Sequence, residues 1–300
     1  MKRRRPACKA AEDLERLELY TPQGINYIRK KYGFHNAKSL GQNFLTDKAV
    51  IDAIIEAADI GEEDLVIEIG PGFGVLTREE APLARKVCAI ELDHRLIPVL
   101  GETLAEFGNV EVINEDVLKT DLKGIIAASG CERTKIIGNL PYYITTPILM
   151  ALLEGGVPAE SIVVMMQKEV AERVLAPPGG RIYGALSVAV DYYCEAEPVC
   201  EVPKEAFLPA PKVDSAVVKL NIRKERPVEL ADEKLFFACI KAGFGQRRKT
   251  LLNSLTGTGY GKAAAAAALE QAGIAANRRA ETLSVAEFAA VANALAGMER

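Results

Sequence analysis

A membrane span requires about 18 consecutive apolar residues, and no apolar stretch of the sequence approaches that length. The sequence also has no pair of cysteines in a CxxC arrangement. Its six cysteines are scattered, at positions 8, 88, 131, 194, 200 and 239. This argues against a metal site or a disulfide framework and fits a reducing location. The basic start MKRRR continues into Pro6 and a charged segment, where a signal peptide would have an apolar core. We therefore expect no membrane contact, no metal and a cytoplasmic protein.

Histidine is scarce, and the glycine pattern of dinucleotide-binding enzymes is missing. The two histidines, His35 and His94, match no catalytic motif, so we expect both to be structural or solvated. The glycines at 70, 72 and 74 follow G-x-G-x-G spacing, whereas dinucleotide binders use G-x-G-x-x-G. A nicotinamide-dependent dehydrogenase is disfavoured on both counts.

Excess positive charge is also lacking, since the net charge is −4. Its distribution is uneven: residues 1–38 carry +6, residues 223–300 carry +4 and the segment between them carries −14. Basic ends on an acidic body can bind a polyanion locally, because charges act over only about 10 Å in salt. The densest basic cluster is Arg247, Arg248 and Lys249. These groups are predicted to bind RNA phosphates, and the alternative is that they pair with nearby glutamates.

The chain divides into an arm, a large domain and a small one. Residues 1–20 are predicted to form a flexible arm, and residues 21–222 a domain in which strands and helices alternate. That alternation is typical of a doubly wound, mostly parallel sheet with helices on both faces. Beyond residue 223 the segments are helical, which predicts a small all-helical domain over 223–300.

Five short β-branched segments are predicted to be strands of the parallel sheet. They cover residues 65–70, 86–92, 110–116, 134–139 and 161–167. Two further segments, 184–199 and 215–222, have no clear helix between them and are predicted to add an antiparallel edge.

Candidate binding groups stand where the first three strands end. The segment EIGPGFG at 68–74 brings glycine backbone close to a ligand. Glu91 follows the second strand, where an acid typically accepts hydrogen bonds from ribose hydroxyls. Asp116 follows the third and could accept from an adenine amino group. Because carboxyl ends of parallel strands meet at one edge, these groups are expected to converge on one crevice.

The stretch GNLPYYITTPIL begins where the fourth strand ends, at the same crevice. An arylamine nitrogen is a poor nucleophile, because its lone pair is delocalised into the ring. Carbonyl acceptors around its hydrogens favour a pyramidal nitrogen, and the Asn139 side chain and the Leu140 carbonyl could supply them. Pro141 shapes the turn, and the Tyr142 ring could stack on an extruded base. The alternative is a turn with core aromatics.

Together these motifs resemble the ribosomal RNA adenine N6-dimethyltransferase family. The resemblance rests first on EIGPGFG and NLPY, and extends over about nine-tenths of the chain, but leaves the arm outside. Further segments that resemble family motifs are SLGQNFL at 39–45, FLPAPKVDSAV at 207–217, FGQRRKTLLNSL at 244–255 and RRAETLS at 278–284. The last two resemble the small-subunit branch.

The resemblance implies a Rossmann-like methyltransferase domain that uses S-adenosyl-L-methionine. It implies that Asn43 and Leu45 contact this cofactor and that Gly70 holds its amino-acid portion. Glu91 is implied to hold the ribose and Asp116 the adenine.

For the reaction, the resemblance implies that Asn139 bridges cofactor and target amine, with Leu140, Pro141 and Tyr142 as the catalytic turn. Tyr142 and Phe207 are implied to sandwich the target base, and a structural loop is the alternative for Phe207. The implied activity is dimethylation of N6 of two adjacent adenosines in the 3′-terminal hairpin of small-subunit (16S) rRNA, by a monomer acting on the small ribosomal subunit. The alternatives are a large-subunit rRNA dimethyltransferase of the antibiotic-resistance type and a non-catalytic ribosome-assembly factor.

Overall fold

The computed structural model describes residues 18–34, 42–246 and 248–298. Within them the chain separates into two compact units. One comprises the described residues up to Ala171 together with Glu197–Asn221, and the other comprises Glu172–Ala196 and the residues from Ile222 on. The predicted boundary near 223 remains a prediction. No helix in the described ranges is both long and apolar enough to cross a membrane.

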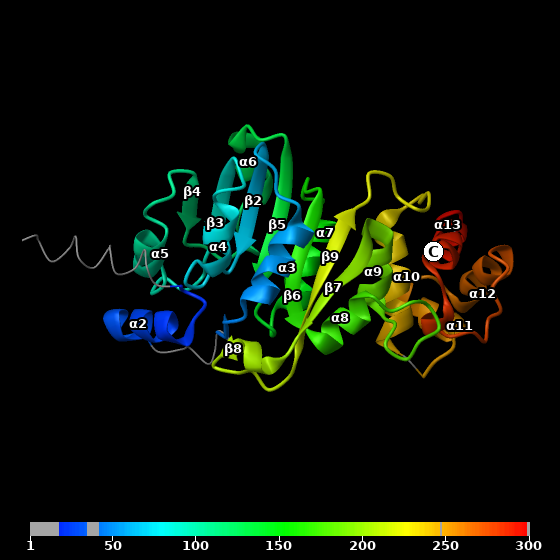
Figure 1. Ribbon diagram of the computed structural model, residues 1–300. Coiled ribbons are helices and arrows are strands. Elements are labelled where there is room, and N and C mark those ends of the chain that lie inside the picture. The colour runs from blue at the N-terminus through cyan, green and yellow to red at the C-terminus, as the bar shows by residue number, and fades with distance from the viewer. Residues whose placement is uncertain (1–17, 35–41, 247, 299–300) are drawn as a thin grey trace, which may run out of the picture. The chain divides into compact units, whose positions relative to one another are not determined.

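The first unit is built on a seven-stranded sheet with the order β4-β3-β2-β5-β6-β9-β7 (Figure 1). Strands β2 to β6 are parallel, and β9 pairs antiparallel with β6. The mostly parallel sheet predicted from the sequence is confirmed. The strands are β2 Asp64–Ile69, β3 Lys86–Ile90, β4 Val110–Ile113, β5 Arg133–Asn139, β6 Ser161–Gln167, β7 Cys194–Val202 and β9 Ser215–Ile222.

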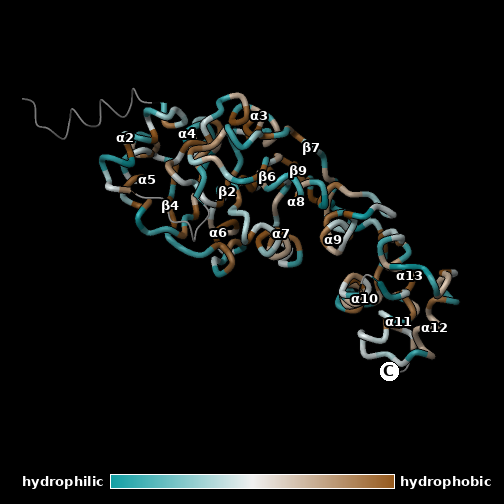
Figure 2. The backbone as a smooth tube through the Cα atoms, turned by 90° about the horizontal axis from the view of Figure 1, so that it is seen from below, coloured by the Kyte–Doolittle hydropathy of each residue, from teal (hydrophilic) through white to brown (hydrophobic). Residues whose placement is uncertain are grey.

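Helices cover both faces of this sheet. In Figure 2 the helices α3 and α4 lie on one side of the strands, and α6 and α7 lie on the other. The helices before β7 are α2 Pro22–Tyr32, α3 Lys48–Ala58, α4 Val75–Glu80, α5 Ile97–Thr103, α6 Leu122–Ser129, α7 Thr145–Glu154, α8 Lys168–Val174 and α9 Ala185–Tyr193. Helix α2 is capped by the Thr21 side chain and ends before Gly33, whose φ is 59°.

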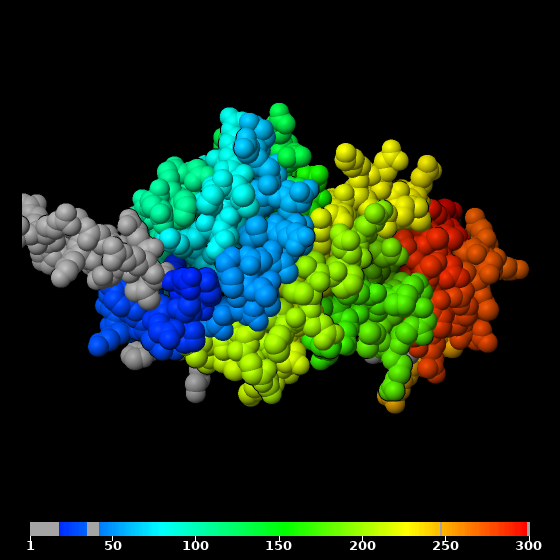
Figure 3. Space-filling view, viewed as in Figure 1, coloured from blue at the N-terminus to red at the C-terminus, as the bar shows by residue number. Residues whose placement is uncertain are grey.

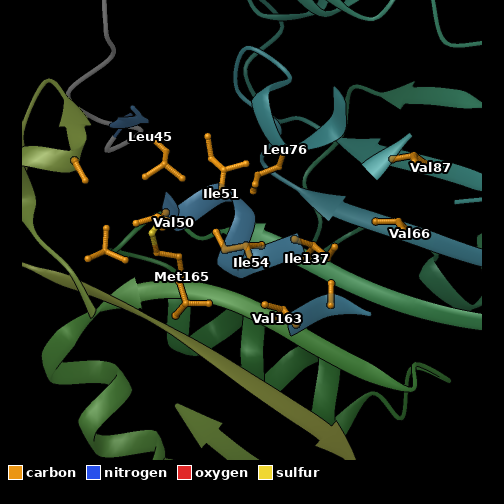
Figure 4. Close-up of a cluster of buried hydrophobic side chains, with 14 of the residues drawn as sticks. Leu45, Val50, Ile51, Ile54, Val66, Leu76, Val87, Ile137, Val163 and Met165 are labelled. Atoms are coloured by element: carbon orange, nitrogen blue, oxygen red, sulfur yellow. The ribbon is translucent and has the colours of Figure 1, made fainter. Parts of the chain in front are cut away.

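The main core lies between the sheet and helices α3 and α4. Ile51 and Ile54 of α3 and Leu76 of α4 belong to one buried cluster with Val66, Ile137 and Val163 of the strands (Figure 4). Strands buried on both faces read as continuous apolar runs, which is why they could be recognised in the sequence. The core holds the strands in register, so that their carboxyl ends form one edge.

A second, two-stranded sheet joins distant parts of the chain. Strand β1 (Phe44–Leu45) pairs antiparallel with β8 (Phe207–Leu208), and Leu45 faces Phe207. In Figure 3 the blue residues that carry α3 and the yellow-green residues around β8 lie side by side on the surface. This pairing fixes the segment that contains Asn43.

The second unit is helical and includes a segment that was expected to be a strand. Residues 185–193 fall within the predicted strand segment 184–199, and they form helix α9 instead. Almost every residue of α9 is buried, so its apolar run has neither helical nor strand periodicity, and the two cannot be told apart. Tyr193 of α9 stacks on Phe237 at 5.6 Å between ring centroids. The remaining helices are α10 Glu233–Gly245, α11 Leu251–Leu255, α12 Lys262–Gln271 and α13 Val285–Ala296.

Candidate active site

A cavity opens at the carboxyl edge of the parallel sheet, within the first unit. Its walls come from the ends of β2, β3 and β5 and from the segment around β1. The candidate residues that line it are Asn43, Leu45, Gly70, Glu91, Asn139, Leu140, Pro141 and Tyr142. Two candidates, Asp116 and Phe207, do not line it. Most of the residues proposed from the sequence therefore meet at one place.

The glycine turn after β2 needs its glycines. Gly70, Gly72 and Gly74 have φ angles of 75°, 61° and 84°, which residues with a Cβ rarely adopt. A Cβ on Gly72 would also lie 3.3 Å from the Phe44 ring. Phe44 stacks on Phe73 of the same turn, with centroids 3.8 Å apart. The turn thus exposes backbone without side chains to the cavity at its glycines, and the β1 segment packs on it through Phe44.

Glu91 is buried and held in place by backbone groups. Its carboxylate accepts hydrogen bonds from the N–H of Asp93 at 2.7 Å and of Gly72 at 3.3 Å. Burial raises the pKa of this carboxyl to about 7, and the two N–H donors oppose that rise. A buried carboxyl on the cavity wall is a strong acceptor for ligand hydroxyl groups once it is ionised.

Asn139 is oriented by the segment that precedes β1. Its Nδ2 donates to the carbonyl of Asn43 at 3.3 Å. The side-chain oxygen Oδ1 makes no hydrogen bond to another described residue, and Asn139 lines the cavity. The amide therefore presents an acceptor to whatever occupies the cavity. The sequence motif pointed to Asn43 but did not reveal that its backbone carbonyl orients Asn139.

Backbone hydrogen bonds hold the turn after Asn139 in place, one of them to strand β6. The N–H of Leu140 donates to Met165 at 3.1 Å, and the carbonyl of Pro141 accepts from the N–H of Ile144 at 3.1 Å. The half-buried Tyr142 shares a hydrogen bond of 2.7 Å with the hydroxyl of Ser215, and burial raises the pKa of its phenol. The turn is a fixed part of the cavity wall.

Asp116 lies beyond the end of β4, outside the cavity. Its carboxylate accepts from the N–H of Leu118 at 3.1 Å, and it is partly exposed. Strand β4 pairs with β3, so Asp116 stands one strand further along the same edge than Glu91. Its predicted contact with an adenine ring remains a prediction.

Phe207 lies in the core in this structure. Its side chain is 3% exposed and belongs to the cluster that includes Leu45, Val202 and Val217. Pairing between β1 and β8 turns the ring inward, because side chains on a strand alternate between faces. This burial favours the structural alternative for Phe207, and its stacking on a base remains a prediction.

Three features of the site could not be predicted from the sequence. The first is a bond from Gln42 Nε2 to Asp93 Oδ2 at 2.8 Å, which ties the β1 segment to the loop after β3. Arg95 pairs with the same carboxylate at 2.6 Å and holds the pKa of Asp93 at about 2. No pattern in the sequence links residues this far apart.

The second such feature is a buried carboxyl pair, Glu68 and Glu80, beneath the glycine turn. Glu68 accepts a hydrogen bond from the Thr77 hydroxyl. Burial raises the pKa of Glu68 to about 7 and that of Glu80 well above its usual range. The charge of Glu68 raises the pKa of Glu80 further, so the pair keeps a proton at neutral pH. The third feature is Tyr143, which is 56% exposed at the cavity.

The predicted RNA-binding cluster is partly described. Arg248 and Lys249 are exposed in the turn between α10 and α11, and Arg247 lies outside the described residues. Two other cations of the helical unit are engaged with neighbours: Arg223 pairs with Glu195 at 2.7 Å, and Arg226 lies 4.6 Å from the centre of the Tyr193 ring.

Within the described part of the chain, neither a metal-like cluster nor His94 belongs to this site. No group of three or more His, Cys, Asp or Glu residues in the described ranges is arranged to hold a metal ion. His94 is exposed and does not line the cavity, and His35 falls outside the described residues.

The chain is similar to proteins of one family along most of its length. The family described as ribosomal RNA adenine dimethylase matches residues 33–297. The chain is 51% identical over 283 residues to ribosomal RNA small subunit methyltransferase A of Shouchella clausii, covering 93% of this chain and 96% of that protein. It is 49% identical over 268 residues to the protein of the same name from Clostridioides difficile, with 89% and 93% covered.

Solved structures of methyltransferases are also similar to this chain in fold. A dimethyladenosine transferase from Plasmodium falciparum superposes with a TM-score of 0.71 at 28% identity, covering 82% of this chain and 95% of that one. The 23S rRNA methyltransferase ErmE superposes with a TM-score of 0.65 at 31% identity, covering 85% and 100%. The predicted methyltransferase fold is confirmed, and the chain belongs to the ribosomal RNA adenine dimethylase family.

Proposed function

We propose that this protein transfers methyl groups from S-adenosyl-L-methionine to N6 of two adjacent adenosines in the 3′-terminal hairpin of 16S rRNA. The observation that carries the proposal is the Asn139–Tyr142 turn, which brings to one cavity an aromatic ring and an amide oxygen that has no partner among the described residues. The names of relatives about half identical over the same length support it. The proposed partner is the small ribosomal subunit, met in the cytoplasm by a monomer.

The cavity fits the proposed cofactor. The glycine turn leaves room for the amino-acid portion at Gly70, and the Glu91 carboxylate suits the ribose hydroxyls. Asn43 and Leu45 form the opposite wall, and Asp116 is proposed to reach the adenine. When bound, S-adenosyl-L-methionine supplies a methyl group on a positively charged sulfur, which is already activated for transfer.

The residues of the turn act on the target amine. Asn139 Oδ1 and the Leu140 carbonyl would accept the two N6 hydrogens and favour a pyramidal nitrogen whose lone pair can attack. Tyr142 would stack on the extruded adenine, fixed by Ser215. Acceleration then comes from positioning and exclusion of water. The cofactor would leave as a neutral thioether, and the methylated nitrogen, which is acidic while it carries the positive charge, would release its proton to water, so no general base is needed. A monomethylated amine keeps one N–H and can bind again for the second transfer.

A large-subunit target is the second candidate, since ErmE, a 23S rRNA methyltransferase, has the same fold at 31% identity. The small subunit is favoured because relatives with about 50% identity bear the small-subunit name. The test is incubation with labelled cofactor and either subunit, each lacking the modification, followed by mapping of labelled nucleotides. Label in 23S rRNA would select the second candidate, and no label in either subunit would indicate a non-catalytic assembly factor.

Cofactor affinity should rise with pH through about 7. The pKa of Glu91 is raised to about 7 by burial, so the carboxyl of the free protein is largely protonated below that pH. Cofactor hydroxyls favour the ionised form, so binding releases a proton and affinity falls as pH drops, by up to about tenfold per unit below 7. Calorimetry between pH 5.5 and 8.5 measures this dependence.

The control is Glu91→Gln, which keeps the shape and cannot ionise. At pH 8 it should bind the cofactor more weakly by about 1.5–3 kcal/mol for each charge-assisted hydrogen bond that is removed. Its pH dependence should be shallower by one proton, which separates Glu91 from the titration of the cofactor's own amino group. Equal slopes for the two proteins would remove Glu91 from the cofactor site.

The basic cluster should govern the salt dependence of RNA binding. Replacing Arg247, Arg248 and Lys249 by alanine should weaken small-subunit binding and leave cofactor affinity unchanged. The slope of log affinity against log salt should become shallower by up to roughly 0.7–0.9 for each phosphate that the variant no longer neutralises. A matched variant with Lys234 and Lys262, both exposed, replaced by alanine should keep the wild-type slope. Equal slopes for the wild type and the cluster variant would mean that Arg247, Arg248 and Lys249 do not contact phosphate.

A further inference from the structure

We infer that Tyr143 forms a second base-stacking subsite, which holds the nucleotide next to the adenine in the cavity. The inference deepens the proposed function and rests on it. Among the described residues Tyr143 is the most exposed large apolar side chain, at 56%, and the others of this kind reach 40–49%. It is also the only aromatic residue among them, and it lines the same cavity as Asn139.

No structural role of the usual kind accounts for this ring. Tyr142 is half-buried and its hydroxyl is bonded to Ser215, so it contributes to the packing of the wall. The Tyr143 hydroxyl makes no hydrogen bond to another described residue, and among the described residues its ring belongs to neither of the two core clusters that pack against the sheet. Leaving a large apolar ring in water is unfavourable by about 25 cal/mol for each Å² that burial would remove. What sets this ring apart from other exposed apolar side chains is its place on the cavity wall, where its face is open to stacking by a base.

The backbone presents this ring in a fixed position. The Pro141 carbonyl accepts from Ile144 N–H at 3.1 Å and from the Thr145 hydroxyl at 3.0 Å, which closes the turn around Tyr143. Helix α7 begins directly afterwards, at Thr145. Little backbone freedom is lost when a ligand binds, so the stack is pre-organised.

A nucleobase is the ligand class that fits. When one adenine leaves its stack to enter the cavity, its neighbour loses a stacking partner. Tyr143 offers an uncharged π-face, which every base can use. Tyr142 and Tyr143 are adjacent in the chain and both line the cavity, so a nucleotide at each would be neighbours along the RNA. With two adjacent target adenosines, one would lie at Tyr142 while the other waits at Tyr143.

Equilibrium binding to small subunits that lack the modification tests the subsite without relying on turnover. Tyr143→Ala should bind the subunit on the order of tenfold more weakly, since one base–aromatic stack is worth roughly 5- to 150-fold in affinity. Tyr143→Phe should stay within about twofold of the wild type, because it keeps the ring. Affinity for S-adenosyl-L-methionine and melting temperature should be unchanged in both. Leu83→Ala removes another exposed apolar side chain, one that does not line the cavity, and should bind normally.

Two results with the Tyr143 variants would overturn the subsite: wild-type affinity in Tyr143→Ala, or an equal loss in Tyr143→Phe, which would implicate the hydroxyl. An equal loss in Leu83→Ala would point to general apolar contact and also contradict it. Failure of the proposed function looks different, because the wild-type protein would then place no methyl groups on the small subunit. If the wild-type protein methylates the small subunit and Tyr143→Ala binds the subunit normally, the stacking subsite is rejected and the proposed function is kept.

Discussion

Asn139→Ala should slow methyl transfer by on the order of 100-fold while affinity for the small subunit changes little. The expected size is that of removing one pre-organised polar group aimed at the reacting atoms. Asn139 lines the cavity, and its Oδ1 has no partner among the described residues, so we expect its contact to form with the substrate. Because that contact is strongest in the transition state, turnover should fall more than affinity. Single-turnover transfer of labelled methyl groups measures it.

Asn221→Ala is a suitable control for this prediction. Asn221 is also a partly buried amide in the same unit, but its side chain donates to Glu197 at 3.0 Å and does not line the cavity. Its replacement should leave transfer unchanged. Wild-type single-turnover rates in Asn139→Ala would exclude the proposed role of the amide in activating the amine.

Phe207→Ala should destabilise the protein by about 3–5 kcal/mol, the usual cost of removing a buried phenylalanine ring. The side chain is 3% exposed, and it packs in the core that includes Leu45 and Val217. The substitution would loosen the β1–β8 pairing and with it the segment that orients Asn139. Chemical denaturation of the two proteins gives the difference in free energy of unfolding.

Phe207→Leu separates packing from stacking. Leucine keeps most of the apolar volume, so the cost in stability should be below about 1.5 kcal/mol, but it has no aromatic face. Near-normal methylation by this variant would support a purely structural Phe207. A stable Phe207→Ala that fails to bind RNA would instead restore the stacking role predicted from the family resemblance.

The strands that build the site could be predicted because their signals are local. The apolar run at 161–167 coincides with β6, and the acids and the amide that follow three other strands mark one sheet edge. Local sequence could not predict α9, since a helix buried on nearly all sides looks like a buried strand. Its character is decided by packing against aromatic residues of α10, some 40 residues later.

The same limit applies inside the candidate site. Residues of the cavity wall were recognisable by type and by their place after strands. Their mutual contacts were not, because Asn139 meets Asn43, and Tyr142 meets Ser215, across separations of 96 and 73 residues. Burial of Phe207 arises in the same way from a pairing of distant strands. Such contacts depend on tertiary structure, to which a motif gives no access.

The division of the chain into two units has a consequence for how such proteins can be recombined. The chain passes between the units three times, after Ala171, Ala196 and Asn221. A chimera joined at residue 223 would therefore combine α10 of one parent with α9 of the other, and would break the ring contacts of Tyr192 and Tyr193 with Phe236 and Phe237. Grafting the helical unit of a relative onto this catalytic unit requires the segment Glu172–Ala196 to travel with it. For the same reason, a substitution in α9 lies between two segments of the catalytic unit along the chain, but it affects the packing of the helical unit.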